Sequence, residues 1–380
     1  MNIESKLPNV GTTIFAVMSG LATKHQAINL SQGFPDFMCS ERLIELVNHF
    51  MKAGKNQYAP MPGDPALREA IATKIQLLYN KTVSADHEIT ITAGGTQAIF
   101  TAIAALVHPG DEVIIIEPAY DCYKPTIELF GGICVPYALI GPDFEVNWQE
   151  LEALVTPRTK MLMVNNPHNP CGTTFDAADM AALKKIVLDH DLILLSDEVY
   201  EHLVYDGRAH LSVLADDELR DRSIAIYSFG KTFHNTGWKM GYAVANPIIT
   251  KEFRKVHQFN VFSVNTPMQS AYAAFMENPQ EYLSLPAFYQ EKRDLFQALM
   301  QQSPLKALPS RGSYFQLYDY SAISQLDDRA FCEYLVEKHG VAAIPLSAFY
   351  TKPPDQHYIR LCFAKKAETL AAAAARLVKL

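Results

Sequence analysis

Short apolar runs recur through the middle of the chain, and helical patterns separate several of them. The apolar runs lie at residues 88–92, 112–116, 134–139, 161–165, 192–196 and 223–227. The clearest helical patterns cover residues 96–107 and 177–188. Apolar strands that alternate with helices are typical of a mostly parallel sheet that is buried under helices on both faces. The sequence therefore predicts an α/β fold.

The character of the sequence changes after about residue 275. The pair Asn278-Pro279 interrupts the chain, a long charged helix is expected over residues 282–302, and short apolar segments follow. A chain of 380 residues is long enough for two domains. The predicted large domain covers residues 41–275. An N-terminal arm, residues 1–40, is expected to join residues 276–380 in a smaller α+β domain.

Composition excludes several classes of protein. The formal net charge of −8 argues against binding to nucleic acid, which depends on clustered Lys and Arg. The N-terminus has no visible signal peptide, and no apolar run approaches the roughly 18 residues of a membrane span. The six cysteines are scattered, which favours reduced thiols in the cytoplasm. Neither they nor the twelve histidines form a metal-ligand pattern, so no metal is expected.

Polar residues follow three of the expected strands at the point where each strand ends. These segments are residues 165–169, 197–200 and 228–231. In an open α/β sheet the ligand binds beyond the carboxyl ends of the strands. We therefore expect the three segments to converge on one site.

Three residues in these segments suit the cofactor pyridoxal phosphate (PLP). Lys231 offers an amine for the aldehyde, Asp197 a carboxylate for the ring nitrogen, and Tyr200 a hydroxyl for the ring oxygen. An isolated buried carboxylate such as Asp197 needs a charged partner, which a protonated pyridine would supply. The alternatives are a surface lysine that closes a turn, and an aspartate that caps the following helix.

The turn after residue 92 is a candidate phosphate site. It opens a helix, and glycines there let the backbone approach an anion at the helix N-terminus. Gly95, Thr96 and Gln97 are the candidates at this turn, and Ser228 and Lys239 offer further contacts.

Aromatic and substrate contacts come from other segments. Tyr120 either stacks on the cofactor ring or belongs to the core. Asn169 lies in a proline-rich loop and suits a donor to the ring oxygen and to a substrate carboxylate, with His168 as a spacer. Arg360 is a single charge in an apolar segment, and arginine suits bidentate binding of carboxylate. Arg311 is the competing candidate.

An ordered set of motifs resembles the fold-type-I PLP-dependent aminotransferases, and within them the kynurenine- and methionine-aminotransferase group. The resemblance covers nearly the whole chain and implies a large domain with a mostly parallel sheet of the seven-stranded type. The matching segments are residues 29–37, 56–58, 92–97, 169–170, 196–200, 228–231, 236–239 and 359–360.

The resemblance implies a role for each matching residue. Lys231 would carry the Schiff base, Asp197 would pair with the pyridinium, and Tyr200 and Asn169 would bind the ring oxygen. Tyr58 would reach the phosphate of the neighbouring subunit, which implies a homodimer. The remaining implied contacts are Gly95, Thr96, Ser228 and Lys239 with phosphate, Tyr120 with the ring, and Arg360, Asn169 and Gly33 with the substrate carboxylate. Gln97 stands where some relatives have glycine.

The expected function is a cytoplasmic aminotransferase with a ping-pong mechanism. Aromatic residues near the expected site favour methionine or another large apolar or aromatic amino acid as donor, with a 2-oxo acid as acceptor. A PLP-dependent cysteine-conjugate β-lyase would use the same residues and remains an alternative. A regulatory, ligand-sensing protein on the same fold is the non-enzyme alternative, and it would usually carry an additional DNA-binding domain.

Overall fold

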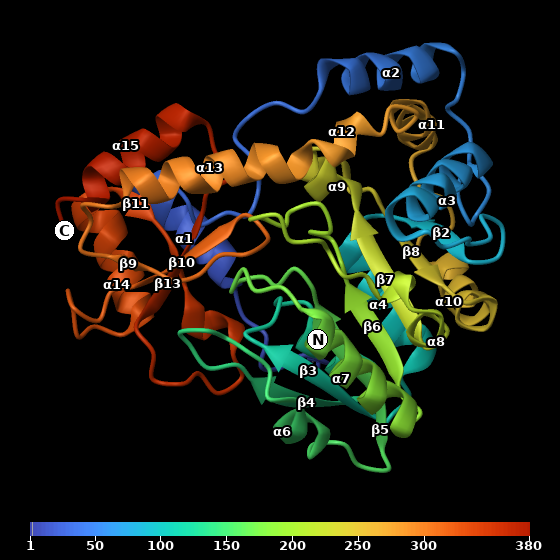
Figure 1. The fold of residues 1–380 in the computed structure, drawn as a ribbon, viewed down its shortest axis with the longest axis horizontal. Coiled ribbons are helices and arrows are strands. Elements are labelled where there is room, and N and C mark those ends of the chain that lie inside the picture. Colours follow the sequence, from blue (N-terminus) through green and yellow to red (C-terminus); the bar gives the residue numbers. More distant parts are fainter. Residues whose placement is uncertain (2) are drawn as a thin grey trace.

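The computed structural model describes Met1 and residues 3–380. The described chain forms a seven-stranded sheet surrounded by helices, with a four-stranded sheet and its own helices beside it (Figure 1). Within these residues no helix combines the length and the apolar character that a bilayer span requires.

The large sheet has the strand order β2-β8-β7-β6-β5-β3-β4. Its strands are β2 (Ile89–Thr92), β3 (Glu112–Glu117), β4 (Ile133–Ala138), β5 (Thr159–Asn165), β6 (Ile193–Asp197), β7 (Ser223–Ser228) and β8 (Gly241–Ala245). The six expected strands are confirmed within one or two residues. β8 was not expected from the sequence, and it runs antiparallel to both of its neighbours, β2 and β7. The other pairings are parallel, so the prediction of a mostly parallel sheet is confirmed.

Side chains of the central strands alternate between two apolar cores, one on each face of this sheet. In β3, Ile114 and Ile116 belong to one core, whereas Val113 and Ile115 belong to the other. This division follows from the two-residue period of a strand, which sends successive side chains to opposite faces. A sheet covered on both faces explains why these strands read as continuous apolar runs.

Helices complete the large unit on both sides of the sheet. The helix that follows β2, α4 (Gly95–Leu106), packs against β7 and β8, and α10 (Pro247–Asn260) packs against α4 (Figure 1). The helices of this part are α2 (Glu41–Lys52), α3 (Pro65–Tyr79), α4 (Gly95–Leu106), α5 (Tyr123–Leu129), α6 (Trp148–Glu152), α7 (Ala177–Asp189), α8 (Asp217–Arg220), α9 (Phe229–Thr232), α10 (Pro247–Asn260) and α11 (Thr266–Phe275).

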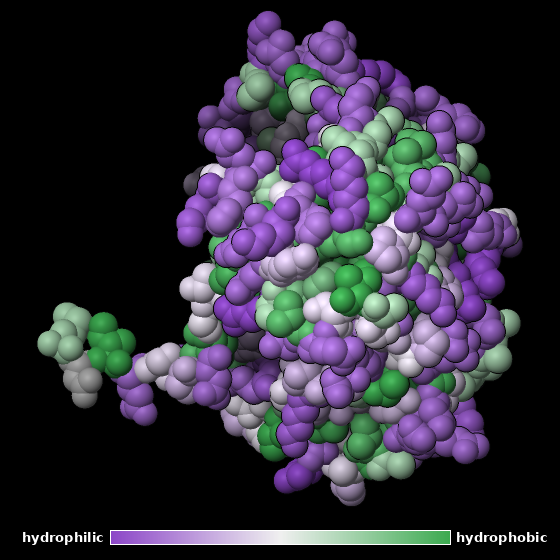
Figure 2. Space-filling model, turned by 90° about the vertical axis from the view of Figure 1, so that its left-hand side faces the viewer, coloured by the Kyte–Doolittle hydropathy of each residue, from purple (hydrophilic) through white to green (hydrophobic). Residues whose placement is uncertain are grey.

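The smaller sheet is antiparallel and has the order β12-β13-β10-β9. Its strands are β9 (Lys306–Ala307), β10 (Phe315–Asp319), β12 (Ile344–Pro345) and β13 (Tyr358–Cys362). The helices near it are α12 (Gln280–Leu283), α13 (Leu285–Leu299), α14 (Asp328–Tyr334) and α15 (Ala367–Leu377). The expected single helix over residues 282–302 is wrong, because two helices meet at Ser284 and a proline occupies the first turn of the second. The side of the molecule that carries α13 and α15 is mostly hydrophilic, with small scattered apolar patches (Figure 2).

The N-terminal segment packs against this smaller sheet rather than against the large one. α1 (Ile14–Lys24) contacts β11 (Val341–Ala342) and β12, and β1 (Ile28–Asn29) pairs with β11 in parallel. The chain after β1 then runs between the two sheets, where the backbone carbonyl of Ser31 accepts a hydrogen bond from Arg360 of β13. Residues 31–34 are therefore held at the boundary between the two sheets.

Candidate active site

The carboxyl ends of β5, β6 and β7 lie side by side, so the polar residues that follow them meet. Asn165 at the end of β5 pairs in register with Asp197 at the end of β6. Asp197 in turn pairs with Ile226, two residues before the end of β7 at Ser228. A cavity of about 330 Å³ opens at this edge of the sheet and reaches across to β13.

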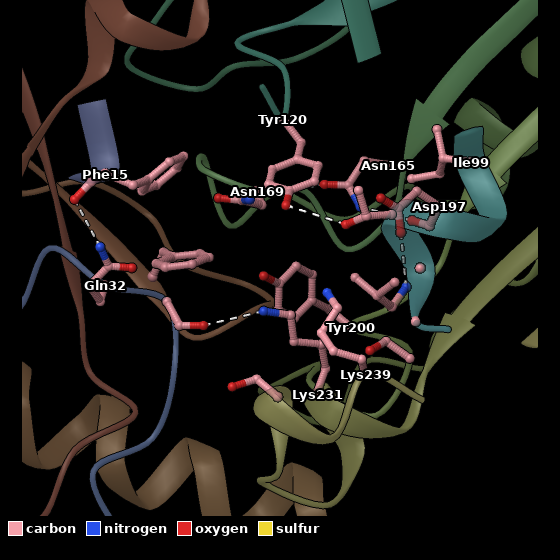
Figure 3. A pocket seen from close by; sticks show the side chains of 18 of the residues that line it. Phe15, Gln32, Ile99, Tyr120, Asn165, Asn169, Asp197, Tyr200, Lys231 and Lys239 are labelled. Atoms are coloured by element: carbon pink, nitrogen blue, oxygen red, sulfur yellow. Dashed lines mark hydrogen bonds between the residues drawn. The ribbon is translucent and has the colours of Figure 1, made fainter. Parts of the chain in front are cut away.

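Most of the candidate residues line this one cavity, as the close view shows for those that it labels (Figure 3). The candidates that line the cavity are Gly33, Gly95, Thr96, Tyr120, Asn169, Asp197, Tyr200, Ser228, Lys231, Lys239 and Arg360. The convergence expected from the strand ends is therefore confirmed.

Lys231 extends from the short helix α9 toward the middle of the cavity. Its Nζ donates hydrogen bonds to the hydroxyl of Tyr314 at 2.9 Å and to the carbonyl of Gly33 at 3.2 Å. The amine also lies 5.7 Å from the ring centre of Tyr200. Burial lowers the pKa of Lys231 to about 8, well below the ordinary value for lysine. The unprotonated fraction of this amine near neutral pH is consequently far larger than that of an ordinary lysine, although most of the amine is still protonated there.

Asp197 is a buried carboxylate at the base of the cavity. Its Oδ2 accepts a hydrogen bond of 2.6 Å from Tyr123, and its Oδ1 accepts one of 3.3 Å from the amide of Val199. None of the ion pairs in the described part of the chain involves Asp197. Burial raises the pKa of Asp197 to about 6. The site thus holds a carboxylate that a cationic ligand atom would stabilise.

One end of the cavity has the features of an anion site. Gly94, whose φ is +83°, caps α4 without a side-chain acceptor, so the first amides of the helix have no cap. The Nζ of Lys239 would lie 3.7 Å from a Cβ built on Gly94, so a cation stands beside these amides. Ser228 and Thr96 add hydroxyls to the same cavity. Lys239 and Lys231 lie on a single connection, between β7 and β8, whose ends pair at Ser228 and Gly241.

The opposite end of the cavity holds a buried guanidinium. Nη1 of Arg360 donates to Oδ1 of Asn169 at 2.9 Å, and Nη2 donates to the carbonyl of Ser31 at 2.8 Å. Its Nε is buried and has no hydrogen-bond partner among the described residues, and the guanidinium carbon Cζ lies 3.9 Å from the ring centre of Phe315. Because the Asn169 oxygen is occupied by arginine, its amide nitrogen remains available as a donor.

The two phenols of the site stay neutral at physiological pH. Burial raises the pKa of Tyr120 to about 12 and raises that of Tyr200 further. The Tyr120 hydroxyl lies 3.5 Å from that of Thr96. The Tyr200 ring meets the Tyr314 ring edge to face, with ring centres 5.1 Å apart. Both phenols can therefore donate hydrogen bonds to a ligand.

Three of the residues that the sequence offered as cofactor or substrate contacts do not line this cavity. The side chain of Gln97 is used elsewhere, since its oxygen accepts from the amide of Ala93 and its nitrogen donates to Thr101. The side chain of Gln97 is thus engaged within the protein, and its predicted contact with the cofactor through the backbone amide at the helix N-terminus stays a prediction. Tyr58 is 81% exposed and packs against Phe262. Arg311 lines a separate cavity.

Sequence reasoning missed several residues that contact the key groups. Tyr123 is hydrogen-bonded to Asp197, and Tyr314 is hydrogen-bonded to Lys231. The ring centre of Phe15 lies 5.4 Å from the guanidinium carbon Cζ of Arg360. Tyr123 could have been suspected, because it follows Tyr120 by three residues in the loop after β3. No local signal marks Phe15 or Tyr314, whose contacts arise from distant parts of the chain.

The sequence pattern of the family described as "Aminotransferase class I and II" matches residues 25–377. The chain therefore belongs to the class I and II aminotransferases, and it is a transaminase with the fold of the fold-type-I enzymes. Its sequence is 53% identical to that of methionine aminotransferase from Escherichia coli (strain K12) over 378 residues, which cover 99% of this chain and 98% of that relative.

Two further comparisons agree with the family. The crystal structure of YbdL from Escherichia coli, whose reactivity identifies a methionine aminotransferase function, superposes with a TM-score of 0.98. It is 53% identical, and the match covers all of both chains. Kynurenine–oxoglutarate transaminase 1 from Homo sapiens is 36% identical, and the match covers 94% of this chain and 93% of that relative.

Enzymes of this family and fold depend on PLP, and the cavity fits that group. The fit rests on the buried carboxylate of Asp197, which has no cationic partner, and on the uncapped amides of α4 beside Lys239. The first suits a protonated ring nitrogen, and the second suits a phosphate. Lys231 lies between them with its amine free of any carboxylate contact.

Proposed function

We propose that this aminotransferase accepts methionine and other large apolar or aromatic amino acids as donors, with PLP as cofactor and a 2-oxo acid as acceptor. One observation carries the proposal. Arg360 is the single arginine among the residues that line the described cavity, and its Nε has no partner. A guanidinium in this state suits the carboxylate that every amino acid and 2-oxo acid carries.

The walls of the cavity support an apolar substrate side chain. Phe15, Tyr120 and Phe315 line it together with the aliphatic residues Ile99 and Val199. A thioether or an aromatic ring would bury its area against these groups. A second carboxylate would lose its hydration without gaining a cationic partner, at a cost of several kcal/mol. The relatives named for methionine and kynurenine support the same preference.

The cofactor contacts follow from the geometry of the cavity. Lys231 would hold the cofactor through its amine, Asp197 would pair with the ring nitrogen, and Tyr200 and Asn169 would donate to the ring oxygen. Tyr120 would lie against the ring. The groups proposed to bind the phosphate are Gly95, Thr96, the Gln97 amide, Ser228 and Lys239. Gly33 and Asn169 would join Arg360 at the substrate carboxylate.

When bound, PLP supplies an aldehyde that takes up the substrate amino group and a protonated ring that withdraws electrons from the substrate α-carbon. The residues of this chain supply the remaining steps. Arg360 fixes the substrate carboxylate and so aims the α-hydrogen at Lys231. Nζ of Lys231, with its pKa lowered to about 8, would take the α-proton and pass it to the cofactor carbon that had carried the aldehyde oxygen. Asp197 keeps the ring nitrogen protonated.

We also propose that the enzyme is a cytoplasmic homodimer. Tyr58 is 81% exposed and lies outside the cavity, so its predicted contact with a phosphate requires a neighbouring subunit. The exposed rings of Phe259 and Phe262 give this surface an apolar character that suits contact with a second copy.

A panel of amino donors against a fixed mixture of 2-oxo acids tests the proposal. Methionine and aromatic amino acids should give higher kcat/KM than aspartate or glutamate, each with formation of the matching 2-oxo acid. Higher kcat/KM for aspartate would overturn the apolar preference. Pyruvate and ammonia released from a cysteine conjugate would instead indicate the β-lyase. Borohydride should remove the yellow colour and leave the label on Lys231, whereas a label on Lys239 would contradict its role.

A further inference from the structure

Lys231, Tyr314 and Gly33 form a closed set of hydrogen bonds in the cavity. The lysine amine donates to the Tyr314 hydroxyl at 2.9 Å and to the Gly33 carbonyl at 3.2 Å. The Tyr314 hydroxyl in turn donates to the same Gly33 carbonyl. Each of the three groups therefore contacts the other two.

The phenol of Tyr314 is enclosed by other side chains. Tyr314 is fully buried, and its ring lies between those of Tyr200 and Tyr289, with ring centres 5.1 Å and 5.9 Å away. Its proton is committed to the Gly33 carbonyl, so the oxygen presents a lone pair to the lysine. The amine lies 5.5 Å from the centre of the Tyr314 ring, on the hydroxyl side of that ring.

We propose that Tyr314 and the Gly33 carbonyl form a holding site for the Lys231 amine whenever that amine is not bonded to the cofactor. This inference rests on the proposed function, in which the substrate amino group displaces Lys231. A released lysine side chain has several rotatable bonds, and two fixed acceptors keep its amine close to the reacting atoms. Tyr314 is thus a positioning residue that acts through Lys231.

The holding site also joins separate parts of the fold. Gly33 is 198 residues and Tyr314 is 83 residues away from Lys231 along the chain. Gly33 belongs to the segment between the two sheets, and Tyr314 precedes β10 of the smaller sheet. The acceptors meet the amine only when both segments pack against the large sheet. The position of Lys231 is therefore coupled to this packing.

The protonation of the held amine depends on every charged or titratable group that faces it. Burial and the charges of Arg360 and Lys239 favour the neutral amine, whereas Cys362 and Asp197 favour the ammonium. Tyr200 is the remaining titratable group beside it. The hydroxyl of Tyr314 accepts a hydrogen bond from the Lys231 amine, and this bond also favours the ammonium form. Its loss should lower the pKa of Lys231.

The test compares Tyr314→Phe with Tyr289→Phe in the full-length chain without cofactor. Tyr289 is the matched control, because it is equally buried beside Tyr314 and its hydroxyl has no partner. The rate at which a small amine-modifying reagent labels Lys231 is followed against pH by peptide mass spectrometry. Tyr314→Phe should lower the apparent pKa of Lys231 by about one unit, the effect of a hydrogen bond to a charged group. Tyr289→Phe should leave it unchanged.

An unchanged pKa in Tyr314→Phe, or an equal shift in both variants, would overturn the holding site. If Tyr314→Phe does not fold, 3-fluorotyrosine at position 314 keeps the hydroxyl but makes it a poorer acceptor, and it should lower the pKa by less. A pKa equal to that of the unmodified chain would then count against the proposal.

A second readout uses the enzyme loaded with PLP. Tyr314→Phe should reduce kcat for methionine several-fold and shift the pH profile of kcat, with little change in KM, because the substrate contacts are intact. An unchanged pH profile would contradict the positioning role. The labelling test does not require bound cofactor, so its result separates this inference from the proposed function. Failure to bind PLP would refute the function and leave the holding site standing.

Discussion

The hydroxyl of Tyr123 donates a hydrogen bond of 2.6 Å to Oδ2 of Asp197, and both groups are buried. Tyr123 begins α5, whereas Asp197 ends β6, so the bond links the loop after β3 to the centre of the site. The carboxylate thus enters the cavity already bound to a neutral donor, with capacity left for a cation.

Replacement of Tyr123 by phenylalanine should raise the pKa of Asp197 further above about 6, because the lost bond stabilises the ionised form. A shift of about one to two units is expected for a hydrogen bond to a charged group. The titration of Asp197 can be followed by ¹³C NMR in the cofactor-free chain. Tyr120→Phe is the control and should leave the Asp197 pKa in place. A lower pKa in Tyr123→Phe would contradict this role of the bond.

Asp197→Asn should stabilise the cofactor-free chain while disabling the loaded enzyme. The pKa of Asp197 rises from 3.8 to about 6 on folding, so its ionised form opposes folding by about 3 kcal/mol above pH 6. The increase in the free energy of unfolding that Asp197→Asn causes should be absent below about pH 4, grow between about pH 4 and about pH 6, and stay constant above that. Urea denaturation at several pH values measures this. Turnover of the loaded variant should fall about 100-fold or more.

Arg360→Lys should raise KM for methionine and for the 2-oxo acid, with cofactor binding unchanged. A lysine cannot offer two parallel donors to a carboxylate, so a loss of about 10- to 100-fold in kcat/KM is expected. The control is Arg311→Lys, because Arg311 lies in a different cavity and should tolerate the change. Equal losses of kcat/KM in the two variants would contradict the proposal that Arg360 binds the substrate carboxylate.

Lys74 and Glu201 form a buried ion pair, and replacing only one of the two residues should lower the stability of the fold. Nζ of Lys74 also donates to Tyr242 at 2.9 Å, and Glu201 accepts from Tyr79 at 3.0 Å. Lys74→Met should destabilise the chain by about 3–5 kcal/mol, because it leaves a buried charge without its partner. Adding Glu201→Gln should restore much of the loss. Breaking the exposed pair of Arg222 with Asp191 should cost no more than about 1 kcal/mol.

Hybrid dimers test whether Tyr58 of one subunit contributes to the active site of the other. When Tyr58→Phe subunits exchange with Lys231→Ala subunits, a Tyr58 that acts across the interface leaves one site of each hybrid intact and the other doubly damaged. Activity should then exceed the sum of the two parent variants. Exchange is verified by native mass spectrometry with one subunit tagged. Activity that remains additive after verified exchange would show that Tyr58 acts within its own chain or not at all.

Local pattern was sufficient to predict the strands that position Asp197 and Lys231, because their apolar runs end in polar residues. It was not sufficient for β8, whose residues Gly241–Ala245 form a short run that only short helical turns separate from β7. Tyr314 escaped prediction for another reason. Its contact with Lys231 depends on how the smaller sheet packs, and no local period encodes that packing. The split into residues 41–275 and residues 1–40 with 276–380 stays a prediction, which the pairing of β1 with β11 supports.

The short connection between β7 and β8 carries two lysines that would contact two different groups of one small molecule, the aldehyde carbon and the phosphate. A bound cofactor would then hold residues 229–240 at two points, and loss of the cofactor would remove both of these contacts at once. Ligand that binds only the folded chain raises stability in proportion to the logarithm of its concentration over Kd. Here that gain should be concentrated in one segment. Backbone amides of this connection should exchange with deuterium faster in the cofactor-free chain, while those of β5 and β6 change little.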